Sequence, residues 1–256
     1  MHRLPARTNI PGGAYPRSRA PIRTYLPIQL RILPEDAAFV ERQPPRRSEI
    51  STDITKIRVA VPVEEDLNFF GNQETPGIFD QAKRLAEQRF GSLSRVSYKL
   101  FTDINQLMFA GPLVAERDVA VGEFFDAYPT AGVDAVRQLV LKSRVMTAAD
   151  AYKAHYRIIE ARRQMQDFWL EHDVLLLPTV GTIYTVEQAM QDPFIPSFNN
   201  GYYTNFANPL GLSAISVPFD RTLSGVPYGV TFVAPAGGEN FLSRLGQYFI
   251  ETTQVN

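Results

Sequence analysis

The sequence predicts an α/β protein in which a mixed β-sheet is flanked by helices. Short apolar runs bounded by turn residues, which are typical of buried strands, occur at 57–62, 94–100, 173–177, 212–217 and 227–233. Segments with helical periodicity separate the first three of these runs. The order strand, helix, strand at the start of this region is typical of a βαβ unit, and the Gly/Pro-rich end favours a mixed sheet.

The predicted elements follow one another without internal repeats. Thr75 as N-cap, with Pro76 at the first helical position, predicts the start of a helix, and Gly91 its end. The middle of the chain has helical periodicity over 103–126, 131–145 and 148–171, and Thr147 with Asp150 predicts a capping box before the last of these. After the strand at 173–177 we expect a long polar loop, two further strands, which should be buried on both faces, and a closing helix at 241–250.

The helix at 148–171 carries one broad apolar stripe. Its members recur at helical spacing, which predicts a helix whose stripe faces the core. They are Ala151, Ala154, Ile158, Ala161, Met165, Phe168 and Trp169.

The first 55 residues differ from the rest of the chain. Residues 1–50 hold nine arginines against four acidic residues, and eight of the 19 prolines. An arginine-rich start could be a targeting presequence, but its prolines interrupt any amphipathic helix. We therefore expect 1–55 to be a basic, poorly ordered arm, and 56–256 to form a partial domain.

Composition excludes several classes of function. The formal net charge of −1 gives no reason to expect nucleic acid or an anionic membrane as a partner. The chain has no cysteine and three scattered histidines, which excludes thiolate sites and does not fit a zinc pattern. Because disulfides are absent, an intracellular, cytoplasmic location is favoured. We expect no metal and no cofactor.

Four sequence blocks occur together and in a fixed order. They are FAGPLVAER (109–117), DVLLLPT (173–179) with TIYT (182–185), YTNFANPLGLSAISVP (203–218) and GVPYGVTFVAP (225–235). In this combination the chain resembles the carboxy-terminal half of the amidase signature family, most closely the allophanate hydrolases, which include the amidase part of urea amidolyases. The resemblance covers about 56–256. It implies the hydrolysis of amide or ureido C–N bonds, as in the conversion of allophanate to ammonia and carbon dioxide.

The catalytic segment of that family has no counterpart here. The family uses a lysine, a bridging serine and a nucleophilic serine in a Gly/Ser-rich loop, whose backbone amides bind the oxyanion. Gly-Gly pairs occur only at 12–13 and 237–238, without that serine pattern, and no Gly-x-Ser-x-Gly elbow is present. We therefore expect no catalytic residue in these 256 residues and an incomplete, truncated amidase domain.

The resemblance implies four substrate-binding residues. Arg117 matches the arginine that binds the substrate carboxylate, and a planar guanidinium suits that task. The alternative is a surface arginine paired with Asp118 or Glu123. Phe109 stands where the family commonly has a tyrosine, so one hydrogen bond to substrate would be lost. Tyr184 and Asn205 lie in loops near the family's active site, where a purely structural role is the alternative.

Two hypotheses of different class follow. In the first, the chain is one half of an amidase that acts on a small carboxylate or ureido substrate, and the other half comes from a companion chain. In the second, it is a non-catalytic relative that serves as a binding or partner subunit. Apolar strands without their covering layer also predict association with a companion chain or with further copies of this chain.

Overall fold

The computed structural model describes residues 53–109 and 111–251. Most of the predicted basic arm, 1–55, therefore lies outside the described residues, as do Ala110 and 252–256. No helix of the described part combines the length and the apolar character needed to cross a membrane.

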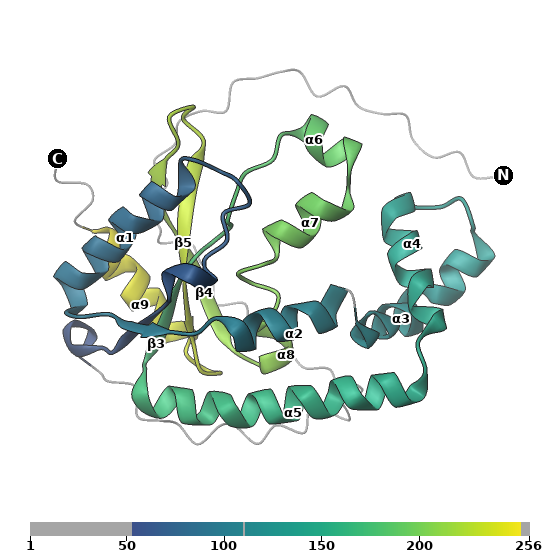
Figure 1. Ribbon diagram of the computed structural model, residues 1–256, viewed down its shortest axis with the longest axis horizontal. Coiled ribbons are helices and arrows are strands. Elements are labelled where there is room, and N and C mark those ends of the chain that lie inside the picture. The colour runs from purple at the N-terminus through teal and green to yellow at the C-terminus, as the bar shows by residue number, and fades with distance from the viewer. Residues whose placement is uncertain (1–52, 110, 252–256) are drawn as a thin grey trace. The chain divides into compact units, whose positions relative to one another are not determined.

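Five strands form one mixed sheet in the order β2-β1-β3-β5-β4 (Figure 1). β1 runs parallel to both β2 and β3, whereas β5 is antiparallel to β3 and β4. The predicted mixed sheet flanked by helices is confirmed. The strands are β1 (Val59–Pro62), β2 (Ser94–Val96), β3 (Val174–Pro178), β4 (Ser213–Arg221) and β5 (Pro227–Ala234).

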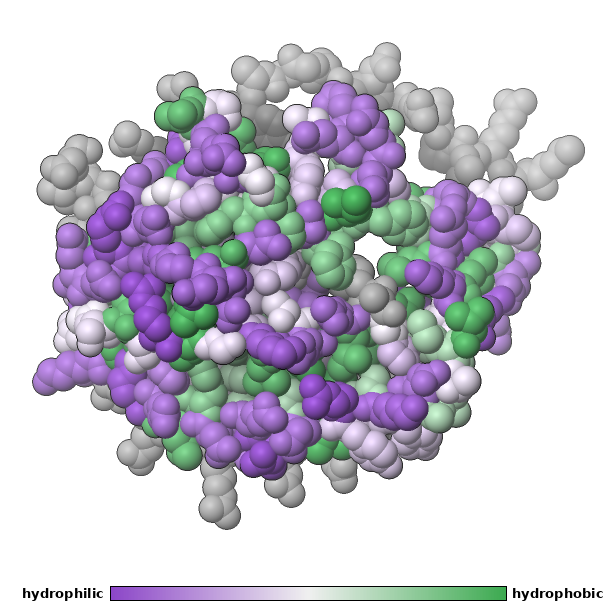
Figure 2. Space-filling model, viewed as in Figure 1, coloured by the Kyte–Doolittle hydropathy of each residue, from purple (hydrophilic) through white to green (hydrophobic). Residues whose placement is uncertain are grey.

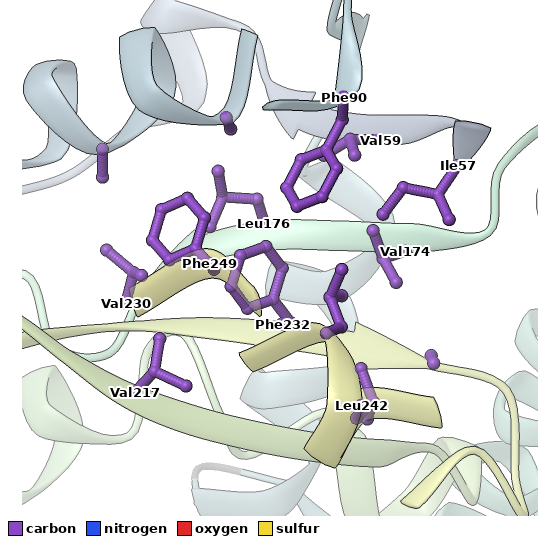
Figure 3. Packing of buried hydrophobic residues seen from close by; sticks show 14 of the residues in the cluster. Ile57, Val59, Phe90, Val174, Leu176, Val217, Val230, Phe232, Leu242 and Phe249 are labelled. Atoms are coloured by element: carbon purple, nitrogen blue, oxygen red, sulfur yellow. The ribbon is translucent and has the colours of Figure 1, made fainter. Parts of the chain in front are cut away.

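Each face of the sheet packs against its own pair of helices. One core contains Leu176 of β3 with side chains of α1 (Thr75–Phe90) and α9 (Glu239–Ile250). Figure 3 shows the rings of Phe90, Phe232 and Phe249 gathered beside Leu176 in this core. The second core contains Leu175 and Leu177 with side chains of α2 (Lys99–Phe109) and α5 (Ala148–Glu171). Side chains alternate along a strand, so β3 supplies both cores.

The helix predicted at 148–171 is confirmed. α5 begins after Thr147, whose side chain accepts a hydrogen bond from the backbone N–H of Asp150 in a complete capping box. α1 begins at Thr75 itself, with Glu74 as N-cap, and ends at Gly91, which has a φ of 89°. Gly91 thus ends α1 in a backbone conformation that other residues rarely adopt.

The helix predicted at 103–126 is wrong in extent. The chain forms α2, a 3-10 turn η5 (Pro112–Val114) and α3 (Ala115–Ala127) instead. Pro112 has no N–H to continue the helix, and a Cβ at Gly111 would lie 2.8 Å from the Cα of Leu107. The segment predicted as 131–145 divides into α4 (Asp134–Lys142) and a 3-10 turn η6 (Ser143–Val145).

Three further expectations are corrected. The polar loop after β3 contains α6 (Val186–Gln191), α7 (Phe194–Asn200) and α8 (Ala207–Leu210), which are too short to show a helical period. The run predicted as a strand at 94–100 ends at Val96, because α2 begins at Lys99. β4 is not buried on both faces: it lies at the edge of the sheet, and Ala214, Ser216 and Pro218 are exposed.

A charged contact joins the starts of β1 and β3. Asp173 is buried, and its carboxylate accepts hydrogen bonds from the backbone N–H of Arg58 at 2.7 Å and from the Arg58 guanidinium at 2.8 and 3.2 Å. The Asp173 carboxylate also raises the pKa of Arg58 above its ordinary value through this hydrogen bonding. Arg58 donates a further hydrogen bond to the carbonyl of Leu170, near the end of α5. One residue pair thus connects two strands and a helix.

We expect Asp173→Ala to lower the free energy of unfolding by roughly 1.5–3 kcal/mol, because the N–H groups of Arg58 lose a charged acceptor. Urea unfolding followed by the fluorescence of Trp169, the chain's one tryptophan, measures this change. Lys56→Ala is the control: Lys56 is mostly exposed in its ion pair with Asp53, so its loss should change stability by less than about 0.5 kcal/mol. Equal effects of both substitutions would contradict the assignment.

Candidate functional site

The candidate site is built around the junction of α2 and α3. Arg117 lies in the first turn of α3, and its Nη1 donates a hydrogen bond to the carbonyl of Met108 at 3.0 Å. Met108 is in the last turn of α2, where carbonyl groups lack helical partners and arginine is a favourable donor. Asp118, one of the two local partners considered for Arg117, is bound by Arg144 at 3.0 Å. Arg117 is therefore fixed against the end of α2.

The backbone of Phe109 lies at the same junction. It is the last residue of α2 and follows Met108 directly. The contact between Arg117 and the Met108 carbonyl thus brings the backbone of Phe109 close to α3. The two positions that the family resemblance pairs in one block lie together in the structure.

Tyr184 and Asn205 belong to a second group in the segment after β3. The hydroxyl of Tyr184 accepts a hydrogen bond from the side-chain amide of Asn199, a buried residue of α7. Asn205 donates its backbone N–H to the carbonyl of Gly201 at 2.9 Å. Its side-chain amide lies over Gly201, where any Cβ would collide with it. Short local contacts therefore fix both residues within one compact segment.

Hydrogen bonds at Tyr202 and Tyr203 connect this segment to α2 and to the loop after β1. The carbonyl of Tyr202 accepts hydrogen bonds from the side-chain amide of Asn105 in α2 and from the hydroxyl of Tyr98 at 3.0 Å. The hydroxyl of Tyr203 donates to the carbonyl of Asn68 at 3.1 Å and accepts from its N–H at 2.7 Å. Burial raises the pKa of Tyr203 well above its ordinary value, so this hydroxyl keeps its proton.

A hollow lies in the surface near helices α4 and α7 (Figure 2). Figure 1 shows α7 beside α2, with α3 and α4 beyond the end of α2. In the same view Figure 2 shows a hollow between α7 and α4, with hydrophobic residues gathered at its rim. Phe194 and Ile195 of α7 are exposed apolar residues. A hollow with an apolar rim is a common feature of small-molecule sites.

Phe70 is a residue of this region that the sequence did not single out. Its φ is 52°, the one positive φ among the described non-glycine residues. It forms a tight turn with Gly71, closed by the N–H of Asn72 donating to the carbonyl of Phe69 at 3.0 Å. The ring of Phe70 contacts Tyr202 edge-on, with centroids 5.5 Å apart. Strain of this kind persists only where neighbours hold it, and it could have been suspected from the two phenylalanines before Gly71.

A cluster of hydroxyls joins the residue after β3 to the middle of β4 and β5. The hydroxyl of Thr179 is 2.7 Å from that of exposed Ser216 and 2.9 Å from that of buried Thr231. Hydroxyls alone supply no base to activate a nucleophile. Across the described range, no hydrogen bond joins a lysine ammonium to a serine hydroxyl, and no group of three or more acidic or histidine side chains could hold a metal ion.

Comparison with known proteins shows which family the chain resembles. Residues 120–242 match the family model described as Amidase. The urea amidolyase of Saccharomyces cerevisiae is 22% identical over 200 residues, which are 77% of this chain and 11% of that protein. The urea amidolyase of Lachancea kluyveri is 24% identical over 177 residues, 68% of this chain and 10% of that protein.

Solved structures give the same result for the fold. The urea amidolyase of K. lactis has a TM-score of 0.74 and 24% identity, and the match covers 79% of this chain and 12% of that one. The allophanate hydrolase of Kluyveromyces lactis has the same score and identity over 33% of its chain. The chain thus spans about a tenth of the length of the curated urea amidolyases that it matches. The resemblance to the amidase signature family is confirmed.

We expect Gly181→Ala to disturb the loop that carries Phe70. A Cβ at Gly181 would collide with the carbonyl of Asn68 and lie 2.9 Å from the ring of Phe70, which should cost roughly 1–3 kcal/mol of stability. Gly77→Ala is the control, because Gly77 is an exposed residue of α1 with nothing near its missing Cβ. That change should be stabilising by up to about 1 kcal/mol. Thermal unfolding of both variants measures the difference, and a stable Gly181→Ala would refute the tight packing.

Proposed function

We propose that this chain contributes the carboxy-terminal part of an amidase domain, and that the domain hydrolyses an amide or ureido C–N bond in a small substrate with a carboxylate, such as allophanate. The observation that carries the proposal is the position of Arg117, held at the α2–α3 junction by the Met108 carbonyl. Its sequence block resembles that of allophanate hydrolases, and the most similar relatives include urea amidolyases. The chain's location is proposed to be the cytoplasm, where a cysteine-free protein meets no need for disulfides.

In this proposal Arg117 binds the substrate carboxylate. A guanidinium can form two parallel hydrogen bonds with a carboxylate, which fixes its orientation as well as its charge. Tyr184 and Asn205 extend the binding surface from the segment after β3. Phe109 keeps an aromatic ring but has no hydroxyl to donate, so the substrate is held with one polar contact fewer than in relatives that have tyrosine there.

The nucleophile is proposed to come from polypeptide beyond these 256 residues. Amide hydrolysis by a serine enzyme needs a base beside the serine. Among the described residues, Lys56, Lys83 and Lys99 form ion pairs with carboxylates, and Ser216 contacts only another hydroxyl, that of Thr179. These contacts support a chain that, in this proposal, binds substrate and does not itself activate the nucleophile. They also favour the second candidate function, a non-catalytic partner subunit that binds the same small anions.

We expect the purified chain to hydrolyse no amide by itself. Ammonia release from allophanate and from simple amides should equal that of a heat-killed control, and a serine-reactive fluorophosphonate should label no residue, because no serine hydroxyl among the described residues is hydrogen-bonded to a lysine or histidine side chain. Labelling of a serine such as Ser216 would show that the chain contains its own nucleophile and would overturn the division of roles.

Substrate binding by Arg117 is tested with malonate, a small dicarboxylate. Arg117→Ala should weaken malonate binding by roughly ten- to a hundredfold, as expected for loss of a charge-assisted hydrogen bond worth about 1.5–3 kcal/mol. The matched control is Arg84→Ala, which removes an exposed arginine of α1. NMR or calorimetric titration that gives equal affinities for wild type and Arg117→Ala would assign Arg117 a structural role alone.

A further inference from the structure

α5 presents apolar side chains on two opposite faces. The face toward the sheet contains the buried residues Ala154, Ile158, Ala161, Met165 and Trp169. The outer face, which Figure 1 shows turned away from the sheet, has its own stripe at spacings of four and three residues. Its first members, Tyr152, Tyr156 and Ile159, are 64%, 63% and 50% exposed.

A solvent-facing helix normally has one apolar stripe and a polar opposite face. The rings of Tyr152 and Tyr156 lie 6.3 Å apart, so they form a continuous surface with Ile159 one turn further on. Aromatic residues are enriched at the centres of protein interfaces. The outer stripe of α5 is therefore an apolar surface that the fold of a single chain does not use.

We propose that the outer face of α5 is an interface between two copies of this chain, in which the two α5 helices pack antiparallel around a two-fold axis. In this register Tyr156 packs on Ile159 of the second copy, and Ile159 on its Tyr156. The next layer places Tyr152 against Arg163 of the second copy, where the guanidinium covers the ring. Repeats of four and three residues are those that allow two helices to interlock along a seam.

Charge decides between this arrangement and its parallel alternative. Lys153 and Glu160 flank the stripe on the same side, seven residues and therefore about two turns apart. Antiparallel packing places Lys153 of each copy beside Glu160 of the other, which gives two attractive pairs. Parallel packing about a two-fold axis would turn this flank toward the opposite flank of the second helix, so it would form neither pair. The apolar stripe and its flanking charges are therefore complementary to the same surface of a second copy, which is why we infer that a second copy covers this face.

The contact can extend beyond the tyrosines. Leu170, near the end of α5, is 68% exposed, and Val145 of η6, before its start, is 80% exposed. The antiparallel register brings the end of α5 in one copy toward η6 of the other, so these two apolar side chains fall at the two ends of the seam. A longer seam is what an interface of stable size requires, since such interfaces bury about 800 Å² on each partner.

Sedimentation of the full chain over a range of concentrations tests the proposal. We expect a reversible dimer whose dissociation constant rises roughly tenfold or more in Tyr156→Glu, because a charge is then buried at the centre of the interface. Leu223→Glu is the control, since Leu223 is 96% exposed at the turn between β4 and β5 and should leave the dimer intact. Lys153→Glu should weaken the dimer, and the double variant with Glu160→Lys should restore it.

Three results would overturn the proposal. The first is a monomer at every concentration tested. The second is a dimer that Tyr156→Glu leaves unchanged but Ala214→Lys abolishes, which would place the contact at the edge strand β4. The third is a failure of the charge exchange to restore association, which would exclude the antiparallel register. None of these results depends on catalytic activity, so the proposed function stands or falls separately.

Discussion

The alternation of side chains along β3 is the constraint on which both layers of the structure depend. The strand's five residues are all buried, with Leu176 in the core under α1 and α9, and Leu175 and Leu177 in the core against α2 and α5. A shift of one residue would exchange the two sets of side chains. The contact of Arg58 with Asp173 fixes where β3 begins relative to β1, and therefore also which residues emerge beyond the carboxyl ends of these parallel strands.

The candidate site follows from that register through a sequence of hydrogen bonds. Thr75 donates its hydroxyl to the carbonyl of Gly181 at 2.7 Å, which joins the start of α1 to the segment after β3. The hydroxyl of Tyr203 is hydrogen-bonded to the backbone of Asn68, and the carbonyl of Tyr202 accepts a hydrogen bond from α2. Arg117 is positioned last, by the end of α2. Because its pKa is raised by burial, Tyr203 remains a neutral donor, so this connection does not change across the physiological pH range.

Features that depend on local sequence signals could be predicted from the sequence. Features that arise from tertiary packing could not. The capping box at Thr147 and the apolar stripe of α5 are local, and both were predicted correctly except for Ala151, which is exposed at the start of α5. The helices α6 to α8 are too short to show a period. The strain at Phe70 depends on Gly181 and Tyr202, which are distant in the sequence. The outer stripe of α5 was hidden because tyrosine, arginine and glutamine interrupt its apolar character, so only its exposure in the folded chain distinguishes it.

The geometry of β4 explains why association is better supported at a helix than at the sheet edge. The carbonyl of Gly229 accepts a hydrogen bond from Thr179, so the backbone of Gly229 points toward β3. Its partner Pro218 therefore points its own backbone outward, because antiparallel pairs alternate between bonded and non-bonded positions. Proline has no N–H to offer at that edge, and the irregular register between Pro218 and Asp220 disturbs it further. An edge altered in this way is a poor template for another strand. The outer face of α5 has no such protection, and its charges favour a second copy of itself.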